Sequence, residues 1–332
     1  MSKLSKENLQ PLFASKVLEL KSLTPGYDNT NDVYFVRTDE GQYVIKILKD
    51  TSENRSVFWR GLHLVFGTTY EASINNQKGL SEYLNKLNVI PVPRILKAES
   101  SLDNPIQKPY VIMEWMRGIP VLNESELFHQ MTQDKEVAYQ LGIFLSKIHA
   151  RQFDYFGNIE GQGRPLSEFP EKLALALKTL GAMRKAAEDR NVQRVLPHFI
   201  RQAQMMRPPK SSGLIMLDLW PTQFLASQQG SFAALVDIES YAIGPIELEL
   251  VLIELWLGNH GKFKEGYFET GAKWPDLEEL RELYRFFLYL LYDCPAQGLD
   301  ACIDSRSKFP QRDRLRKRSP VPKPRLGGPE ML

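Results

Sequence analysis

Two short apolar segments late in the chain, residues 213–217 and 232–238, constrain the fold more than any other feature of the sequence. They interrupt a series of amphipathic helices, and an aspartate lies at the end of each, Asp218 and Asp237. Short strands that deliver carboxylates to a cleft are the simplest arrangement for this pattern. The sequence therefore predicts a mainly helical lobe that carries a small amount of sheet at one functional site.

The helical pattern begins after residue 117 and defines a second lobe over residues 118–305. Apolar residues recur there at helical spacing, with polar residues on the opposite face. The predicted helices are 136–151, 170–191, 195–206, 245–257 and 276–293.

The first third of the chain has a different pattern, rich in β-branched and aromatic residues, and we assign residues 1–117 to a small strand-rich lobe. Residues 39–41, Asp-Glu-Gly, form a good turn between two strands. A chain of 332 residues is long enough for two lobes with one cleft between them. The predicted elements are strands 33–38, 42–48 and 109–114 and a helix from Tyr70 to Leu87.

The composition excludes several classes of protein. An apolar fraction of 43% and a charged fraction of 25% are typical of soluble globular proteins, and no apolar run is long enough to span a bilayer. The first ten residues lack the apolar core of a secretory signal, so we expect a cytoplasmic protein. Cys294 and Cys302 are too few for a disulfide framework and are interpreted as ordinary thiols.

The positive charge of the chain is concentrated in residues 306–332, which hold nine Lys or Arg against two acids. This segment has almost no large apolar residues, and such a composition predicts a disordered tail. Contact with nucleic-acid phosphates is the alternative function for it. A cloning or gene-model extension would have the same composition.

Three residues in the stretch 214–239 have the chemistry of phosphoryl transfer. Asp218 is followed five residues later by the amide of Gln223, and Asp237 ends the next apolar segment. Phosphoryl transfer needs a carboxylate to orient the attacking hydroxyl and oxygen ligands to hold Mg²⁺ on the phosphates. The three side chains are therefore candidates for one catalytic site.

This stretch resembles the aminoglycoside phosphotransferase and choline kinase families, whose catalytic loop reads His-Gly-Asp, four residues, Asn. By the order of its motifs the resemblance covers roughly residues 20–255. It implies an α+β, two-lobed, protein-kinase-like fold and transfer of the γ-phosphoryl group of ATP to a hydroxyl of a small molecule, such as an aminoglycoside-, choline- or sugar-like acceptor. It also implies that Asp218 is catalytic and that Gln223 and Asp237 bind Mg²⁺.

The same resemblance assigns the nucleotide-binding residues. Lys46 on the second hairpin strand is similar to the lysine that holds the α- and β-phosphates. Gly26 and Asn29 belong to a run of turn-forming residues at the place of the family's phosphate-covering turn. Glu114 and Met116 lie in the segment similar to the hinge, whose backbone would bond the adenine edge.

The resemblance also implies an acid that pairs with Lys46. Glu71 lies at the start of the predicted helix and Glu82 lies late in it, and we prefer Glu71. The insertion 50–69 separates Lys46 from this helix, and it serves either to adjust their register or to cover the mouth of the cleft.

The sequence departs from the family pattern at three positions. Met216 and Leu217 replace His-Gly, and Gln223 replaces the asparagine with a side chain that is one methylene longer. These changes favour a second hypothesis, a pseudokinase that binds nucleotide or a partner as a scaffold. A protein kinase is the third and least favoured, because no Ala-Pro-Glu signature is present.

Structural roles are the alternatives for the same residues. Asp218 is also suited to a helix cap, Asp237 to a strand-end turn, and Lys46 to an exposed position on a strand. Glu239 either assists at the metal or caps the next segment. Glu247 and Glu249 lie near the place where related enzymes have an aspartate that braces the catalytic loop, and for both we favour the structural role.

Overall fold

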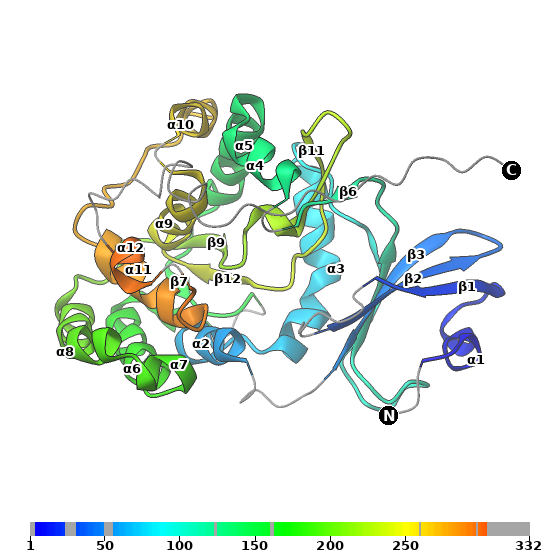
Figure 1. Cartoon of the computed structure of the whole chain (residues 1–332), viewed down its shortest axis with the longest axis horizontal. Helices are drawn as coiled ribbons and strands as arrows, with labels where there is room; N and C mark the ends of the chain where they lie inside the picture. The colour runs from blue at the N-terminus through cyan, green and yellow to red at the C-terminus, as the bar shows by residue number, and fades with distance from the viewer. Residues whose placement is uncertain are drawn as a thin grey trace, which may run out of the picture.

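The structure is a computed structural model that describes residues 4–23, 31–49, 56–122, 125–159, 163–258, 260–296 and 298–303. Its α+β architecture has a β-sheet lobe at the N-terminal end and a helical lobe at the C-terminal end, as the sequence predicts (Figure 1). The basic tail, residues 306–332, lies outside the described residues. The division of the chain at residue 117 stays a prediction.

The N-terminal lobe is built on a five-stranded antiparallel sheet with the order β1-β2-β3-β5-β4. The predicted hairpin turn is present, because the Thr38 amide donates to the Gly41 carbonyl at 2.9 Å. Two of the strands, β1 and β4, were not predicted from the sequence. The elements are α1 (Lys6–Leu9), the 3₁₀ helix Gln10–Leu12, β1 (Val17–Ser22), β2 (Asn31–Thr38), β3 (Gln42–Leu48), α3 (Tyr70–Lys86), β4 (Ile95–Glu99) and β5 (Tyr110–Glu114).

The two faces of this sheet have different neighbours. Ile45 and Ile47 of β3 belong to a small apolar cluster with Leu9 of α1, so the N-terminal helix covers that face. Side chains alternate along a strand, and Lys46 therefore points to the opposite face, toward the helical lobe. This alternation places the one buried lysine of β3 where the two lobes meet.

The C-terminal lobe is mainly helical and contains short strands at its centre. None of the described helices is long and apolar enough to cross a membrane. Its elements are β6 (Ile119–Pro120), α4 (Glu126–Gln133), α5 (Lys135–His149), β7 (Tyr155–Phe156), β8 (Arg164–Pro165), the 3₁₀ helix Leu166–Glu168, α6 (Phe169–Gly181), α7 (Arg184–Glu188), α8 (Arg190–Met205), β9 (Gly213–Met216), the 3₁₀ helix Pro221–Gln223, β10 (Phe224–Ala226), β11 (Phe232–Leu235), β12 (Tyr241–Gly244), α9 (Ile246–Leu257), α10 (Gly261–Phe268), α11 (Arg281–Leu291) and α12 (Leu299–Ile303).

One predicted helix, residues 170–191, is wrong as a single element. The chain leaves the helix after Gly181, forms the short α7, and begins α8 at Arg190. The side chain of Asp189 caps α8 by accepting from two backbone amides, and Arg184 adopts a positive φ of 40° at the start of α7. Gly181 and Asp189 are a stop signal and a start signal, and the apolar periodicity that continues across them hid the break.

The insertion between the lysine strand and α3 forms an additional helix, α2 (Val57–Phe66). Ser56 caps its first turn, and Gly67 ends it with a left-handed φ of 69°. At Gly61 a Cβ atom would meet the Leu291 side chain of α11 at 2.3 Å, so α2 lies directly against the C-terminal lobe (Figure 1). This insertion therefore forms part of the junction between the lobes.

Candidate active site

A cleft of about 1190 Å³ lies between the sheet and the helical lobe. Seven of the predicted site residues line it, which is every one that the structure describes. Gly26 and Asn29 lie outside the described residues, so their roles stay predictions. The seven lining residues are Lys46, Glu71, Glu114, Met116, Asp218, Gln223 and Asp237.

Strand pairing explains why residues distant in sequence meet in this cleft. Strands β9 and β12 are antiparallel with Met216 opposite Tyr241, so Asp218, two residues after β9, lies near the segment that precedes β12. Strands β10 and β11 pair in the same way, and the Val236 amide donates to the Gln223 carbonyl at 2.9 Å. Two antiparallel pairings, with β10 and β11 lying between β9 and β12 in the chain, thus place Asp218, Gln223 and Asp237 together.

Asp218 and Gln223 are in direct contact. The Gln223 side-chain amide donates to Oδ2 of Asp218 at 2.9 Å, and Oδ1 of Asp218 has no hydrogen-bond partner among the described residues. Burial, together with the nearby Asp237 and Glu239, raises the pKa of Asp218 well above its ordinary value. Asp218 therefore has one oxygen fixed by Gln223 and one available to a hydroxyl group in the cleft.

Lys46 lies between two carboxylates. Its Nζ is 3.0 Å from Oδ1 of Asp237 and 3.0 Å from Oε1 of Glu239. Burial alone would lower the pKa of Lys46, but the charges of Asp237 and Glu239 outweigh burial and raise it. Lys46 therefore keeps its positive charge inside the cleft.

The prediction that Glu71 pairs with Lys46 does not hold in this structure. Glu71 lines the cleft, yet among the described residues Lys46 has its ion pairs with Asp237 and Glu239 alone. Burial and Asp237 raise the pKa of Glu239 to about 7, against the opposing effects of Lys46 and Asn31. The physical reason is distance: Asp237 and Glu239 lie in the segment between β11 and β12, and each places a carboxylate oxygen 3.0 Å from the ammonium group of Lys46.

The oxygen atoms near Asp237 fit a magnesium ion that also binds phosphates. The carboxylate of Asp237 is 31% exposed, and Oε1 of Gln223 has no hydrogen-bond partner within the described chain. No group of three or more His, Cys, Asp or Glu that could enclose a metal exists among the described residues. Mg²⁺ in nucleotide sites is usually held by one or two protein oxygens plus phosphates and water, so such a group is not required.

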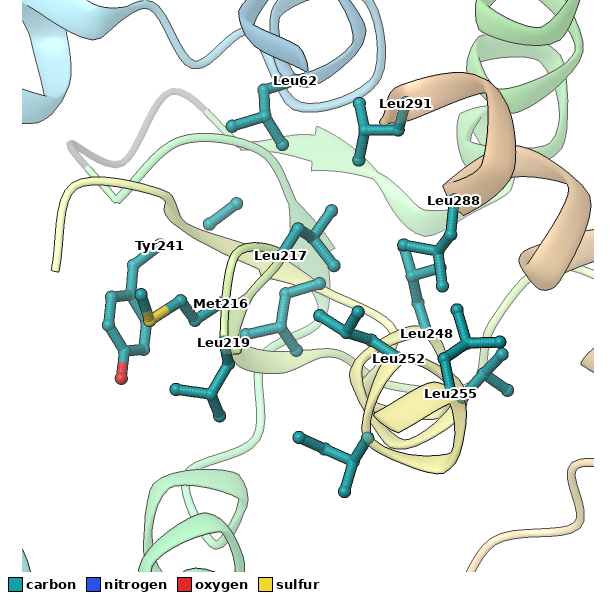
Figure 2. Close-up of a cluster of buried hydrophobic side chains, with 14 of the residues drawn as sticks. Leu62, Met216, Leu217, Leu219, Tyr241, Leu248, Leu252, Leu255, Leu288 and Leu291 are labelled. Carbon is teal, nitrogen blue, oxygen red and sulfur yellow. The ribbon is translucent and has the colours of Figure 1, made fainter. Parts of the chain in front are cut away.

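The residues that replace His-Gly are part of the core. Met216 and Leu217 are fully buried, and Figure 2 shows them with Leu219 among leucines of α2, α9 and α11. The loop that carries Asp218 is anchored on both sides of this residue, because Trp256 donates to the Leu219 carbonyl at 2.8 Å and the Tyr292 hydroxyl donates to the Leu217 carbonyl. Apolar packing and two backbone contacts therefore hold the segment that carries Asp218.

Glu249 braces the same segment from α9, in the structural role that we favoured for it. It is completely buried, and its Oε1 accepts from the backbone amide of Met216 at 2.8 Å. Its Oε2 is 2.6 Å from Nε2 of His149, whose Nδ1 is 2.9 Å from the Tyr267 hydroxyl. His149 is thus a buried residue with both ring nitrogens occupied.

The predicted hinge leaves the backbone of Met116 available to a ligand. The side chain of Glu114 is occupied by Arg94, with distances of 3.0 Å to the amide and 2.9 Å to Nε. The backbone amides of Glu114 and Trp115 are also bonded, to Arg94 and Gln42. The backbone of Met116 has no hydrogen-bond partner among the described residues and lines the cleft, so it can bond a ligand.

The sequence of this chain matches the model of one protein family. The model of the phosphotransferase enzyme family matches residues 20–283. The chain belongs to this family. No curated protein matches this phosphotransferase by sequence at a significant level.

Solved structures show the same fold at low identity. The phosphotransferase is similar to choline kinase LicA from Streptococcus pneumoniae, with 17% identity, a TM-score of 0.54 and 87% of each chain covered. It is also similar to macrolide 2'-phosphotransferase MphH from Brachybacterium faecium, with 17% identity, a TM-score of 0.52, and 90% of this chain and 97% of that chain covered. The sequence predicted this family, but it did not predict the contacts of Asn31, Tyr70 and Glu239 around Lys46.

Proposed function

We propose that this phosphotransferase uses ATP and Mg²⁺ to transfer the γ-phosphoryl group to a hydroxyl of a small molecule. The observation that carries the proposal is the presence of Lys46, Asp237 and a half-paired Asp218 in one cleft. These groups match the three needs of the reaction: a cation for the phosphates, oxygen ligands for the metal, and a carboxylate for the attacking hydroxyl.

In this proposal each residue has a defined task, and Gln223 has two. Oδ1 of Asp218 accepts the hydrogen bond of the acceptor hydroxyl, and Gln223 fixes the orientation of the carboxylate through Oδ2. Asp237 and Gln223 would hold Mg²⁺, which when bound neutralises negative charge that develops on the β- and γ-phosphates. Lys46 contacts the α- and β-phosphates, and the Met116 backbone bonds the adenine edge. Solved structures include LicA in complex with AMP, which supports a nucleotide on this fold.

We place the acceptor on the opposite side of the cleft, beside α2 and α11. Phe58 of α2 stacks on Tyr292, with ring centroids 5.9 Å apart and planes at 23°. Asp293 follows Tyr292 in the same wall of the cleft. An apolar ring surface next to a carboxylate suits an aminoglycoside-, choline- or sugar-like molecule, because such acceptors combine CH surfaces with hydroxyl or ammonium groups.

Nucleotide binding is the first test. We expect calorimetric titration with a non-hydrolysable ATP analogue to show binding that is stronger in the presence of Mg²⁺, and we expect this enhancement to disappear in Asp237→Ala. The reason is that Asp237 is the most exposed of the carboxylates around Lys46 and supplies an oxygen to the metal. Equal enhancement in wild type and variant would remove Asp237 from the metal site.

A second candidate function is a pseudokinase scaffold that binds nucleotide or a partner without transfer. The engagement of Lys46 by two carboxylates and the replacement of His-Gly by Met216 and Leu217 favour it. The two functions differ in turnover. Magnesium-dependent binding of nucleotide with no release of ADP across a panel of hydroxyl acceptors would favour the scaffold.

The glutamine in the metal-binding position gives a separate prediction. We expect Gln223→Asn to lower kcat about tenfold, because the shorter side chain withdraws from Oδ2 of Asp218, now 2.9 Å away, and that hydrogen bond is lost. Steady-state ADP release measures the change. A kcat higher than wild type would instead mean that the extra methylene is a handicap and that asparagine restores the metal ligand.

A further inference from the structure

Four buried polar side chains form one continuous chain of contacts at the nucleotide side of the cleft. Lys46, Glu239, Asn31 and Tyr70 are 7%, 7%, 6% and 5% exposed. Nζ of Lys46 contacts Oε1 of Glu239 at 3.0 Å, and the Asn31 amide donates to both oxygens of Glu239 at 3.2 and 3.1 Å. The hydroxyl of Tyr70 donates to Oδ1 of Asn31.

The hydrogen bonds run in one direction along this chain of contacts. Both oxygens of Glu239 accept from the NH₂ group of Asn31, and Oε1 also accepts from Lys46. The carbonyl oxygen of Asn31 then faces Tyr70, and the phenol must be the donor. Tyr70 thereby fixes the amide, the amide fixes the carboxylate, and the carboxylate fixes the ammonium group of Lys46.

The four residues come from separate elements around the cleft. Tyr70 is the first residue of α3, and its ring packs edge-on against Trp59 of α2 with centroids 5.1 Å apart. Asn31 is the first residue of β2, and Glu239 lies between β11 and β12. The neighbouring Glu71, which the family resemblance offers as the partner of Lys46, has no ion pair with it in the described part of the chain.

We propose that Tyr70 and Asn31 are positioning residues that hold Glu239 and so direct Lys46 toward the α- and β-phosphates of ATP. They take the task that the resemblance gives to Glu71. This inference rests on the proposed nucleotide site and adds to it the residues that fix its lysine. Because three elements contribute, the position of Lys46 depends on how α3 and β2 lie against the segment that carries Asp237 and Glu239.

Tyr70→Phe is the sharpest test, because it removes one oxygen atom and keeps the ring that packs on Trp59. Oδ1 of Asn31 loses its donor, the amide is free to rotate, and Glu239 loses its fixed partner. The matched control is Tyr284→Phe: Tyr284 is also buried, and its hydroxyl has no hydrogen-bond partner among the described residues. Both variants lose the same atom from a buried ring.

The experiment is calorimetric titration of wild type and both variants with adenosine and with a non-hydrolysable ATP analogue plus Mg²⁺. For Tyr70→Phe we expect the affinity for the ATP analogue to fall about tenfold, since one hydrogen bond in a buried network is lost. We expect its affinity for adenosine, which has no phosphate for Lys46 to contact, to stay unchanged. Tyr284→Phe should bind both ligands as wild type does.

Asn31→Asp provides a second test. The new side chain has nearly the same shape but presents an oxygen to Glu239 in place of the NH₂ group, so Glu239 loses this donor. Affinity for the ATP analogue should fall about a hundredfold, as expected for a displaced binding group, and affinity for adenosine should stay unchanged. A residue that only stabilises the fold would show no loss specific to phosphate-bearing ligands.

The outcomes separate this inference from the function on which it rests. If wild type binds the ATP analogue and both Tyr70→Phe and Asn31→Asp bind it equally well, the positioning role is overturned and the nucleotide site remains. If adenosine and the ATP analogue weaken to the same degree, the network supports the fold and does not direct Lys46. If wild type binds neither ligand, the proposed function fails and this inference fails with it.

Discussion

Asp218→Asn is expected to lower kcat about 10²–10⁴-fold, the range for loss of a positioned proton acceptor, while affinity for the ATP analogue is retained. Asparagine has nearly the same shape, but its amide cannot accept the proton of an attacking hydroxyl. Oδ1 of Asp218 is the oxygen without a partner among the described residues, so this change acts on the proposed reacting atom. Steady-state ADP release with an acceptor found by screening measures the loss.

The stability of the same variant separates a catalytic from a structural role. Burial, Asp237 and Glu239 all oppose the charged form of Asp218, so its replacement by a neutral side chain should leave the free energy of unfolding equal or higher. Asp300→Asn, at an exposed aspartate of α12, is the matched control and should change neither quantity. A loss of stability accompanied by loss of nucleotide binding would assign Asp218 a structural role instead.

Glu249→Ala is expected to lower the free energy of unfolding by about 2–6 kcal/mol, because each of two buried groups left without its partner costs about 1–3 kcal/mol. Glu249 is completely buried, and its loss leaves both His149 and the Met216 amide without an acceptor. Because Met216 lies two residues before Asp218, we also expect catalysis to weaken at temperatures where the protein is still folded. Urea unfolding followed by circular dichroism measures the change in stability.

Two other variants test whether the loss of stability in Glu249→Ala comes from the contacts of Glu249. Glu247→Ala changes a partly buried glutamate of the same helix that has no ion pair among the described residues, and it should have a much smaller effect. Glu249→Gln keeps an acceptor for the Met216 amide and should recover part of the lost stability. Equal unfolding midpoints for Glu249→Ala and Glu247→Ala would show that the contacts of Glu249 contribute little.

Local signals made much of the fold predictable. The turn at residues 39–41 is read from residue types that tolerate sharp bends, and α3 and α5 from apolar residues at helical spacing. These signals depend on residues close together in the chain, so a single sequence is enough to recognise them. Helix ends were less certain, because α6 and α7 share an apolar face and the break at Gly181 does not interrupt the periodicity.

The sequence by itself predicted Asp218, Gln223 and Asp237 as one candidate site, because their residue types and their order along the chain match the needs of phosphoryl transfer. Their meeting in the cleft follows from local strand pairing, β9 with β12 and β10 with β11. The family match over residues 20–283 agrees with this interpretation.

Only the tertiary structure decided which groups surround Lys46. Glu71 and Glu239 are both plausible partners for a long, flexible ammonium side chain, and no local rule ranks contacts between residues about 190 positions apart, as Lys46 and Glu239 are. The sequence pattern likewise did not predict that α2 packs against Leu291 or that Asn31 contacts Tyr70. Such choices depend on how whole elements pack in three dimensions, since burial and distance then determine which polar groups meet.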